Sequence, residues 1–124
     1  MRVMKTMIGI VSVVLSLAVG QAAATDITDK TTCAAMVTAF DSNDPARVLP
    51  FGTYVLNMMD ELDSKHTRRG EPGIMAQLSD DGRSSMVAIT SVNCRKYPKM
   101  TIYNSAAFVY TGMRAIQMQL GTAK

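Results

Sequence analysis

The sequence contains few side chains of the kinds that enzymes use as nucleophiles or bases. It has one histidine, His66, and two cysteines, Cys33 and Cys94, among 124 residues. A cysteine nucleophile needs a free thiol and a base, and His66 lies in a segment rich in charged residues. The cysteines lack the Cys-x-x-Cys spacing of thioredoxin-type redox sites and zinc ribbons. The sequence therefore predicts no catalytic residue, metal site or cofactor, and we expect that the protein is not an enzyme.

Two groups of carboxylates are the remaining candidates for chemistry. Asp60, Glu61 and Asp63 lie close together among basic residues. Paired carboxylates can act as general acid and base, but this mixture of signs is more typical of a solvated, salt-bridged helix face. The Asp-Asp-Gly run at 80–82 lacks the other ligands of a calcium loop, so we interpret it as capping of a helix.

The start of the chain has the three-part layout of a secretory signal peptide. Basic residues open it, residues 7–20 form an uncharged apolar run, and three alanines at 22–24 suit cleavage. The apolar run is shorter than the roughly 20 residues that span a bilayer. We predict a signal peptide over residues 1–24, a single domain over residues 25–124, export from the cytoplasm and no stable membrane insertion.

Charge and composition exclude several classes of protein. The full chain has 13 basic and 10 acidic residues, and two of the basic residues precede residue 25, which leaves 11 against 10. This balance is unlike that of a dedicated nucleic-acid binder, so we expect no nucleic-acid partner. Hydrophobic residues make up 48% of the chain, which excludes a disordered composition. The length leaves no room for a TIM barrel.

The two cysteines permit only one intramolecular pairing. Because export places them in an oxidising compartment, we predict a disulfide between Cys33 and Cys94. Closing a loop of this size restrains the unfolded chain by about 4 kcal/mol in the loop-entropy model. That is a large part of the net stability of a small domain, typically about 5–15 kcal/mol.

Hydrophobic periodicity predicts four helices and no strand. The first covers residues 33–40 behind a threonine cap. The second covers residues 50–66, with Pro50 in its first turn. Residues 71–82 form a loop with one turn near 74–78. The third and fourth helices cover 83–96 and 101–120.

Two of these helices carry the clearest apolar stripes. In the second helix the stripe is Phe51, Tyr54, Val55, Met58, Met59 and Leu62, and in the fourth it is Ile102, Ala106, Val109, Met113, Ile116 and Leu120. Thr101 and Gly121 have the residue types of caps at the two ends of the fourth helix. Gly112 inside that helix suggests a close contact with another helix. The predicted fold class is all-α, a small four-helix bundle with one disulfide.

Methionine is the unusual component of the composition. The chain has 11 methionines, eight of them after residue 24, and most of these eight lie on predicted apolar faces, so we interpret them as an adaptable core. Met75, Met100 and Met118 are the ones least clearly placed in a core. The alternative is a flexible apolar surface that binds many partners.

Three segments together resemble the HdeA/HdeB family of periplasmic acid-stress chaperones. They are Thr32-Cys33-Ala34-Ala35-Met36, Cys94-Arg95-Lys96-Tyr97-Pro98, and the helix start with Ile102 and Ala106. The resemblance covers about 33–40 and 85–110. It implies a periplasmic, all-α protein with one disulfide. It also implies a homodimer at neutral pH that loosens in acid and exposes apolar surface to unfolded client proteins.

Acid chemistry is compatible with this resemblance. At pH 2–3 most of the ten carboxylates would protonate, since their reference pKa values lie near 4. The net charge of the exported chain would then rise from about +1 to about +11 or +12, and such self-repulsion loosens compact states. The expected client-binding residues are Phe51, Tyr54, Val55, Met58, Met59, Leu62, Val109, Met113 and Ile116.

A second resemblance leads to a different function. Phe51-Gly52-Thr53-Tyr54-Val55 and Tyr97-Pro98 are similar to segments of the Rap1a/Tai immunity type. That resemblance implies one folded surface that binds a single periplasmic toxin, a cell-wall amidase, at neutral pH. The partner is therefore either a range of unfolded clients or one specific protein.

Overall fold

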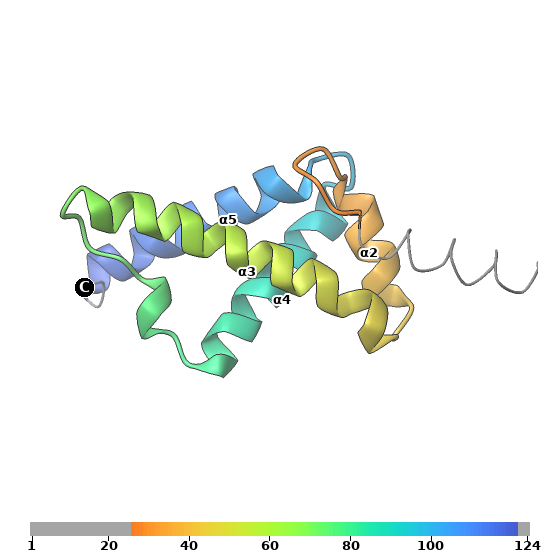
Figure 1. Ribbon diagram of the computed structural model, residues 1–124, viewed down its shortest axis with the longest axis horizontal. Coiled ribbons are helices and arrows are strands. Elements are labelled where there is room, and N and C mark those ends of the chain that lie inside the picture. Colours follow the sequence, from red (N-terminus) through yellow and green to blue (C-terminus); the bar gives the residue numbers. More distant parts are fainter. Residues whose placement is uncertain (1–25, 122–124) are drawn as a thin grey trace, which may run out of the picture.

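The computed structural model describes residues 26–121, and in that range it is all-helical (Figure 1). This confirms the predicted all-α class with four helices. The predicted signal peptide lies outside the described residues. The elements are α2 (Cys33–Asp41), α3 (Pro45–Arg68), the 3₁₀ turn η1 (Met75–Gln77), α4 (Asp80–Lys96) and α5 (Ile102–Leu120).

The second predicted helix begins earlier than Pro50. α3 begins at Pro45, because the Asp44 carboxylate accepts a hydrogen bond from the backbone N–H of Ala46 at 3.0 Å and caps the helix. Asn43 adopts a left-handed conformation with φ 55° and turns the chain between α2 and α3. Pro50 lies inside α3, where it removes one helical hydrogen bond.

The third predicted helix also begins earlier than expected. The Ser79 hydroxyl accepts a hydrogen bond from the N–H of Gly82 at 3.1 Å, so α4 starts at Asp80 rather than Arg83. Asp80 and Asp81 lie in the first turn, where negative charge interacts favourably with the helix dipole. The turn predicted near 74–78 is confirmed as η1.

The ends of the last helix are as predicted. The Thr101 hydroxyl accepts a hydrogen bond from the N–H of Asn104 at 3.1 Å, and Gly121 closes α5 with φ 70°. The close contact predicted at Gly112 is wrong, since a Cβ built there would meet nothing within 4 Å. Gly112 lies on the exposed side of α5.

The helices form one core along the length of the molecule. α3 and α5 pack side by side, α4 returns toward α2, and α2 lies across one end (Figure 1). The C-terminal ends of α3 and α5 lie together at the other end. The buried apolar side chains come from all four helices and from the loop at η1.

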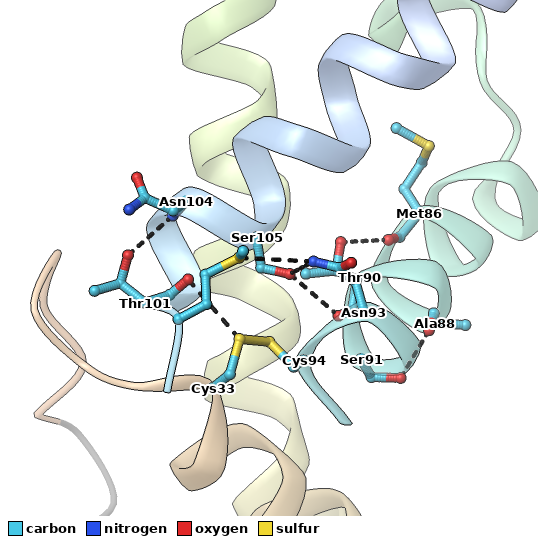
Figure 2. The surroundings of a disulfide bond; sticks show 11 residues. Cys33, Met86, Ala88, Thr90, Ser91, Asn93, Cys94, Thr101, Asn104 and Ser105 are labelled. Atoms are coloured by element: carbon cyan, nitrogen blue, oxygen red, sulfur yellow. Dashed lines mark hydrogen bonds between the residues drawn. A yellow bond between two sulfur atoms is a disulfide. The ribbon is translucent and has the colours of Figure 1, made fainter. Parts of the chain in front are cut away.

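The predicted disulfide between Cys33 and Cys94 is confirmed, and both cysteines are fully buried. It joins the start of α2 to the end of α4 (Figure 2). Nearby, Thr32 forms an isolated antiparallel bridge with Thr101, and the Cys33 N–H donates to the Met100 carbonyl at 2.7 Å. Over residues 26–121 no helix has the length and apolar character needed to cross a membrane.

Candidate functional site

The main candidate site is a carboxylate inside the core. Asp63, on α3, is 6% exposed and is the one buried charged side chain among the described residues. Its oxygens accept hydrogen bonds from the N–H of Ile74 at 2.9 and 3.2 Å, from the N–H of Met75 at 3.0 Å and from the Tyr110 hydroxyl at 2.6 Å. The interpretation of Asp63 as part of a solvated face is therefore wrong. We call Asp63, Ile74, Met75 and Tyr110 the Asp63 latch.

Helical spacing explains why Asp63 points inward. Val55, Met59 and Asp63 are spaced four residues apart, and all three are buried on the same face of α3. The chain then reverses through Gly70, whose φ is 77°. Gly73 lets the loop approach closely, because a Cβ at that position would lie 2.7 Å from Oδ2 of Asp63. The loop can therefore place its two N–H groups against the carboxylate.

The latch also includes α5 through Tyr110, which is 2% exposed. Burial, and then the hydrogen bond to Asp63, raise the pKa of Tyr110 well above its ordinary value. Tyr110 therefore remains a hydrogen-bond donor at neutral and acid pH. Its ring stacks with His66 at 6.1 Å between centroids. One turn further along α5, Arg114 donates to the Pro72 carbonyl at 2.9 Å, so α5 holds the loop at a second point.

A second carboxylate fastens the end of α3 to the same loop. Oε1 of Glu71 lies 2.9 Å from Nδ1 of His66 and accepts hydrogen bonds from Nε and Nη2 of Arg69 at 3.1 and 2.9 Å. The hydrogen bond with His66, followed by those from Arg69, holds the pKa of Glu71 below its usual value. Glu71 and Arg69 are exposed and His66 is half-buried, and through His66, whose ring stacks with Tyr110, the cluster adjoins the latch.

Two further carboxylates connect helices. Arg83 of α4 makes two hydrogen bonds to Asp60 of α3, at 3.0 and 2.8 Å. Arg95 of α4 pairs with Asp41 of α2 at 2.8 Å, and this hydrogen bond holds the pKa of Asp41 below its usual value. These carboxylate contacts, together with the latch, involve every helix of the described chain. Acid can therefore weaken polar contacts throughout the bundle.

The residues expected to bind clients mostly form the core. Val55, Met58, Met59 and Val109 are buried, and Phe51, Tyr54, Leu62 and Met113 are half-buried against them. Ile116 differs, since it is 49% exposed. The structure thus packs most of the two stripes against each other in the core, whereas Ile116 and Leu120, near the end of α5, are exposed.

The three methionines least clearly placed by the sequence, Met75, Met100 and Met118, differ in how deeply they are buried. Met75, whose place was left open by the sequence, belongs to the core: it is 2% exposed and contributes its N–H to the latch. Met100 is half-buried against the core, and Met118 is 44% exposed.

Sequence reasoning missed the latch, although one signal was present. The four-residue spacing of Val55, Met59 and Asp63 continues the apolar stripe into a carboxylate. A charged residue at a core position needs partners, and here they lie 11, 12 and 47 residues further along the chain. Within residues 26–121 no three His, Cys, Asp or Glu side chains are grouped as metal ligands. Comparison of the chain with protein-family models, curated proteins and solved structures finds no match.

Proposed function

We propose that this protein is a periplasmic acid-stress chaperone, a homodimer at neutral pH that loosens at low pH and binds unfolded client proteins to prevent their aggregation. The observation that carries the proposal is the Asp63 latch. A carboxylate buried in the core accepts hydrogen bonds from a loop and from a neighbouring helix. Contacts of this kind depend on the charge of the carboxylate, because an ionised acceptor makes the stronger hydrogen bonds.

Protonation would weaken the latch at each of its partners. An ionised carboxylate makes charge-assisted hydrogen bonds, which are roughly twice as strong as neutral ones. A protonated Asp63 also carries a hydrogen on one of the oxygens that accept bonds in the neutral-pH structure. The loop would then be free to leave α3. Its departure would uncover Ile74 and Met75, which are 4% and 2% exposed, and with them the apolar residues of α3 beneath.

The surface carboxylates act in the same direction. Because the folded-state pKa values of Asp41 and Glu71 are lowered, the stability they contribute is present above their unfolded-state values, near 4. It is lost as the pH falls through the lower folded-state values. Each exposed contact contributes little alone, but they weaken together and in the same pH range as the general rise in positive charge.

The disulfide limits how far the helices can separate in acid. A disulfide does not titrate, so Cys33 and Cys94 keep α2 attached to α4 in acid. The stripes of α3 and α5 can then separate and offer apolar surface while part of the bundle stays connected. A disulfide is also compatible with an exported protein.

The test uses the purified, oxidised protein and an unrelated acid-labile enzyme. The mixture is taken to about pH 2.5 and returned to neutral, and light scattering and recovered enzyme activity are followed. Suppressed aggregation at stoichiometric ratios, absent when the mixture stays at pH 7, supports the proposal. No suppression at any ratio contradicts it and favours the alternative, a protein that binds one periplasmic partner at neutral pH.

A further inference from the structure

Arg114 of α5 places a positive charge in a partly buried position beside the latch. Its Nε is the one buried side-chain nitrogen or oxygen in residues 26–121 for which the structure shows no hydrogen-bond partner. The same guanidinium reaches the loop through Nη2, which donates to the Pro72 carbonyl at 2.9 Å. Burial of a charged group is costly unless an opposite charge compensates it, so the surroundings of Arg114 must supply one.

Asp63 is that charge, and Tyr110 lies between the two groups. Arg114 follows Tyr110 by four residues, so their side chains share one side of α5. The Tyr110 hydroxyl donates to Oδ1 of Asp63 at 2.6 Å. Burial and the Asp63 carboxylate raise the pKa of Tyr110, whereas the Arg114 guanidinium beside the hydroxyl acts in the opposite direction. The carboxylate and the guanidinium therefore adjoin the same hydroxyl.

The other charged groups at the latch change in acid while Arg114 does not. The ring of His66 stacks with Tyr110, and its Nδ1 lies 2.9 Å from Oε1 of Glu71 and 3.2 Å from Nη2 of Arg69. At neutral pH two carboxylates balance two arginines in this region. At low pH the carboxylates are protonated and the imidazole is positive, whereas arginine stays charged. Acid therefore leaves only positive charges around the latch.

The remaining helices packed against α5 supply no charge that could take the place of Asp63. The charged residues of α4 lie at its two ends, where Arg83 pairs with Asp60 and Arg95 pairs with Asp41. Asp41 is also the one charged residue of α2. The charged residues of α4 outside these pairs are exposed, and they are Asp80, Asp81 and Lys96.

We propose that Arg114 opens the latch when Asp63 loses its charge. The inference rests on the proposed function and names the residue that acts on the latch. At pH 7 the carboxylate compensates the guanidinium, and both hold the loop against α5. Protonation of one member of such a pair leaves the other charge uncompensated in a partly buried position. The guanidinium then gains hydration by leaving the loop, so α5 releases it.

The test compares how steeply stability falls with pH in three variants. Arg114→Gln removes the charge but keeps a donor for the loop, Arg114→Lys keeps the charge, and Arg68→Gln removes an exposed charge from α3. The urea concentration at half unfolding is measured by circular dichroism between pH 7 and about pH 4. Its slope against pH reports the difference in bound protons between the folded and unfolded states. If Arg114→Gln does not fold at pH 7, Arg114→Met, which has no polar group to bury, takes its place.

We expect wild type, Arg114→Lys and Arg68→Gln to lose stability at similar rates as the pH falls, and Arg114→Gln to lose about half as much. A slope for Arg114→Gln as steep as that of Arg68→Gln would overturn the assignment, because Arg114 would then only clamp the loop. So would a slope for Arg114→Lys as shallow as that of Arg114→Gln, because the charge would then not be the cause.

The same proteins separate this inference from the proposed function. Slopes as expected, together with a wild type that fails to suppress aggregation in acid, would leave the role of Arg114 standing without the chaperone. Equal slopes, together with a wild type that suppresses aggregation, would leave the chaperone standing without this role for Arg114.

Discussion

Replacing Asp63 by alanine tests whether the latch stabilises the fold. The substitution leaves the N–H groups of Ile74 and Met75 and the Tyr110 hydroxyl without their acceptor. A buried donor without a partner costs about 1–3 kcal/mol. The loop lies at the surface and can open to water, which recovers part of this cost. For three donors we therefore expect the free energy of unfolding to fall by about 3–5 kcal/mol, which is less than the roughly 3–9 kcal/mol of three fully unpaired donors.

Urea unfolding at pH 7, followed by circular dichroism, measures this change. Two controls separate the latch from a general effect of substitution. Glu61→Ala removes an exposed carboxylate of the same helix, and we expect a change within about 0.5 kcal/mol. Tyr110→Phe removes a single donor, and we expect a loss of about 1–2 kcal/mol.

Urea unfolding at lower pH tests whether the latch responds to acid. A latch that protons weaken predicts a smaller difference between wild type and Asp63→Ala near pH 3 than at pH 7. An Asp63→Ala protein as stable as the Glu61→Ala control at pH 7 would refute the reasoning. An undiminished difference near pH 3 would show that the latch does not respond to acid.

Three further predictions follow from the described contacts. Replacing both Cys33 and Cys94 by serine should lower the free energy of urea unfolding by about 4 kcal/mol. Small-angle scattering should find the variant more expanded than wild type near pH 2.5; equal radii of gyration would show that the disulfide does not restrict expansion in acid. Gly73→Ala should lower the melting temperature, because its Cβ would lie 2.7 Å from Oδ2 of Asp63 and 2.9 Å from Cγ2 of Thr67. Gly112→Ala, with open space around it, should instead stabilise α5 by about 1 kcal/mol. A Gly73→Ala protein that melts at a higher temperature than Gly112→Ala would contradict the placement of the loop. In NMR titrations the carboxyl carbons of Asp41 and Glu71 should titrate at lower pH than in unfolded peptides. Arg95→Ala should return the pKa of Asp41 toward its ordinary value, since the hydrogen bond from Arg95 lowers this pKa; an unchanged pKa in the variant would show that Arg95 is not the cause.

The features predicted correctly from the sequence depend on nearby residues or on a single possible pairing. The caps of α5 are local, because Thr101 bonds to an N–H three residues away. The disulfide had one possible pairing. The starts of α3 and α4 were missed because Asp44 and Ser79 cap their helices upstream of the apolar periodicity. A cap determines where a helix begins, whereas periodicity only indicates which face is buried.

The latch could not be predicted in the same way, because its bonds join distant parts of the chain. Two of the donors to Asp63 are backbone N–H groups, and any non-proline residue of the loop offers one. Only the folded path of the loop selects Ile74 and Met75. Likewise, the stripe on α3 is the same in sequence whether it faces a core or a client. The structure places it against α5.

The central claim is that loss of charge at Asp63 activates the chaperone. The most direct measurement is the pH at which aggregation of the acid-labile enzyme is half suppressed, for wild type, Asp63→Asn and Glu61→Gln. The asparagine has the shape of the protonated acid and carries no charge. The account predicts that Asp63→Asn becomes active at a higher pH than wild type, while Glu61→Gln keeps the wild-type midpoint. The same midpoint for all three proteins would contradict it.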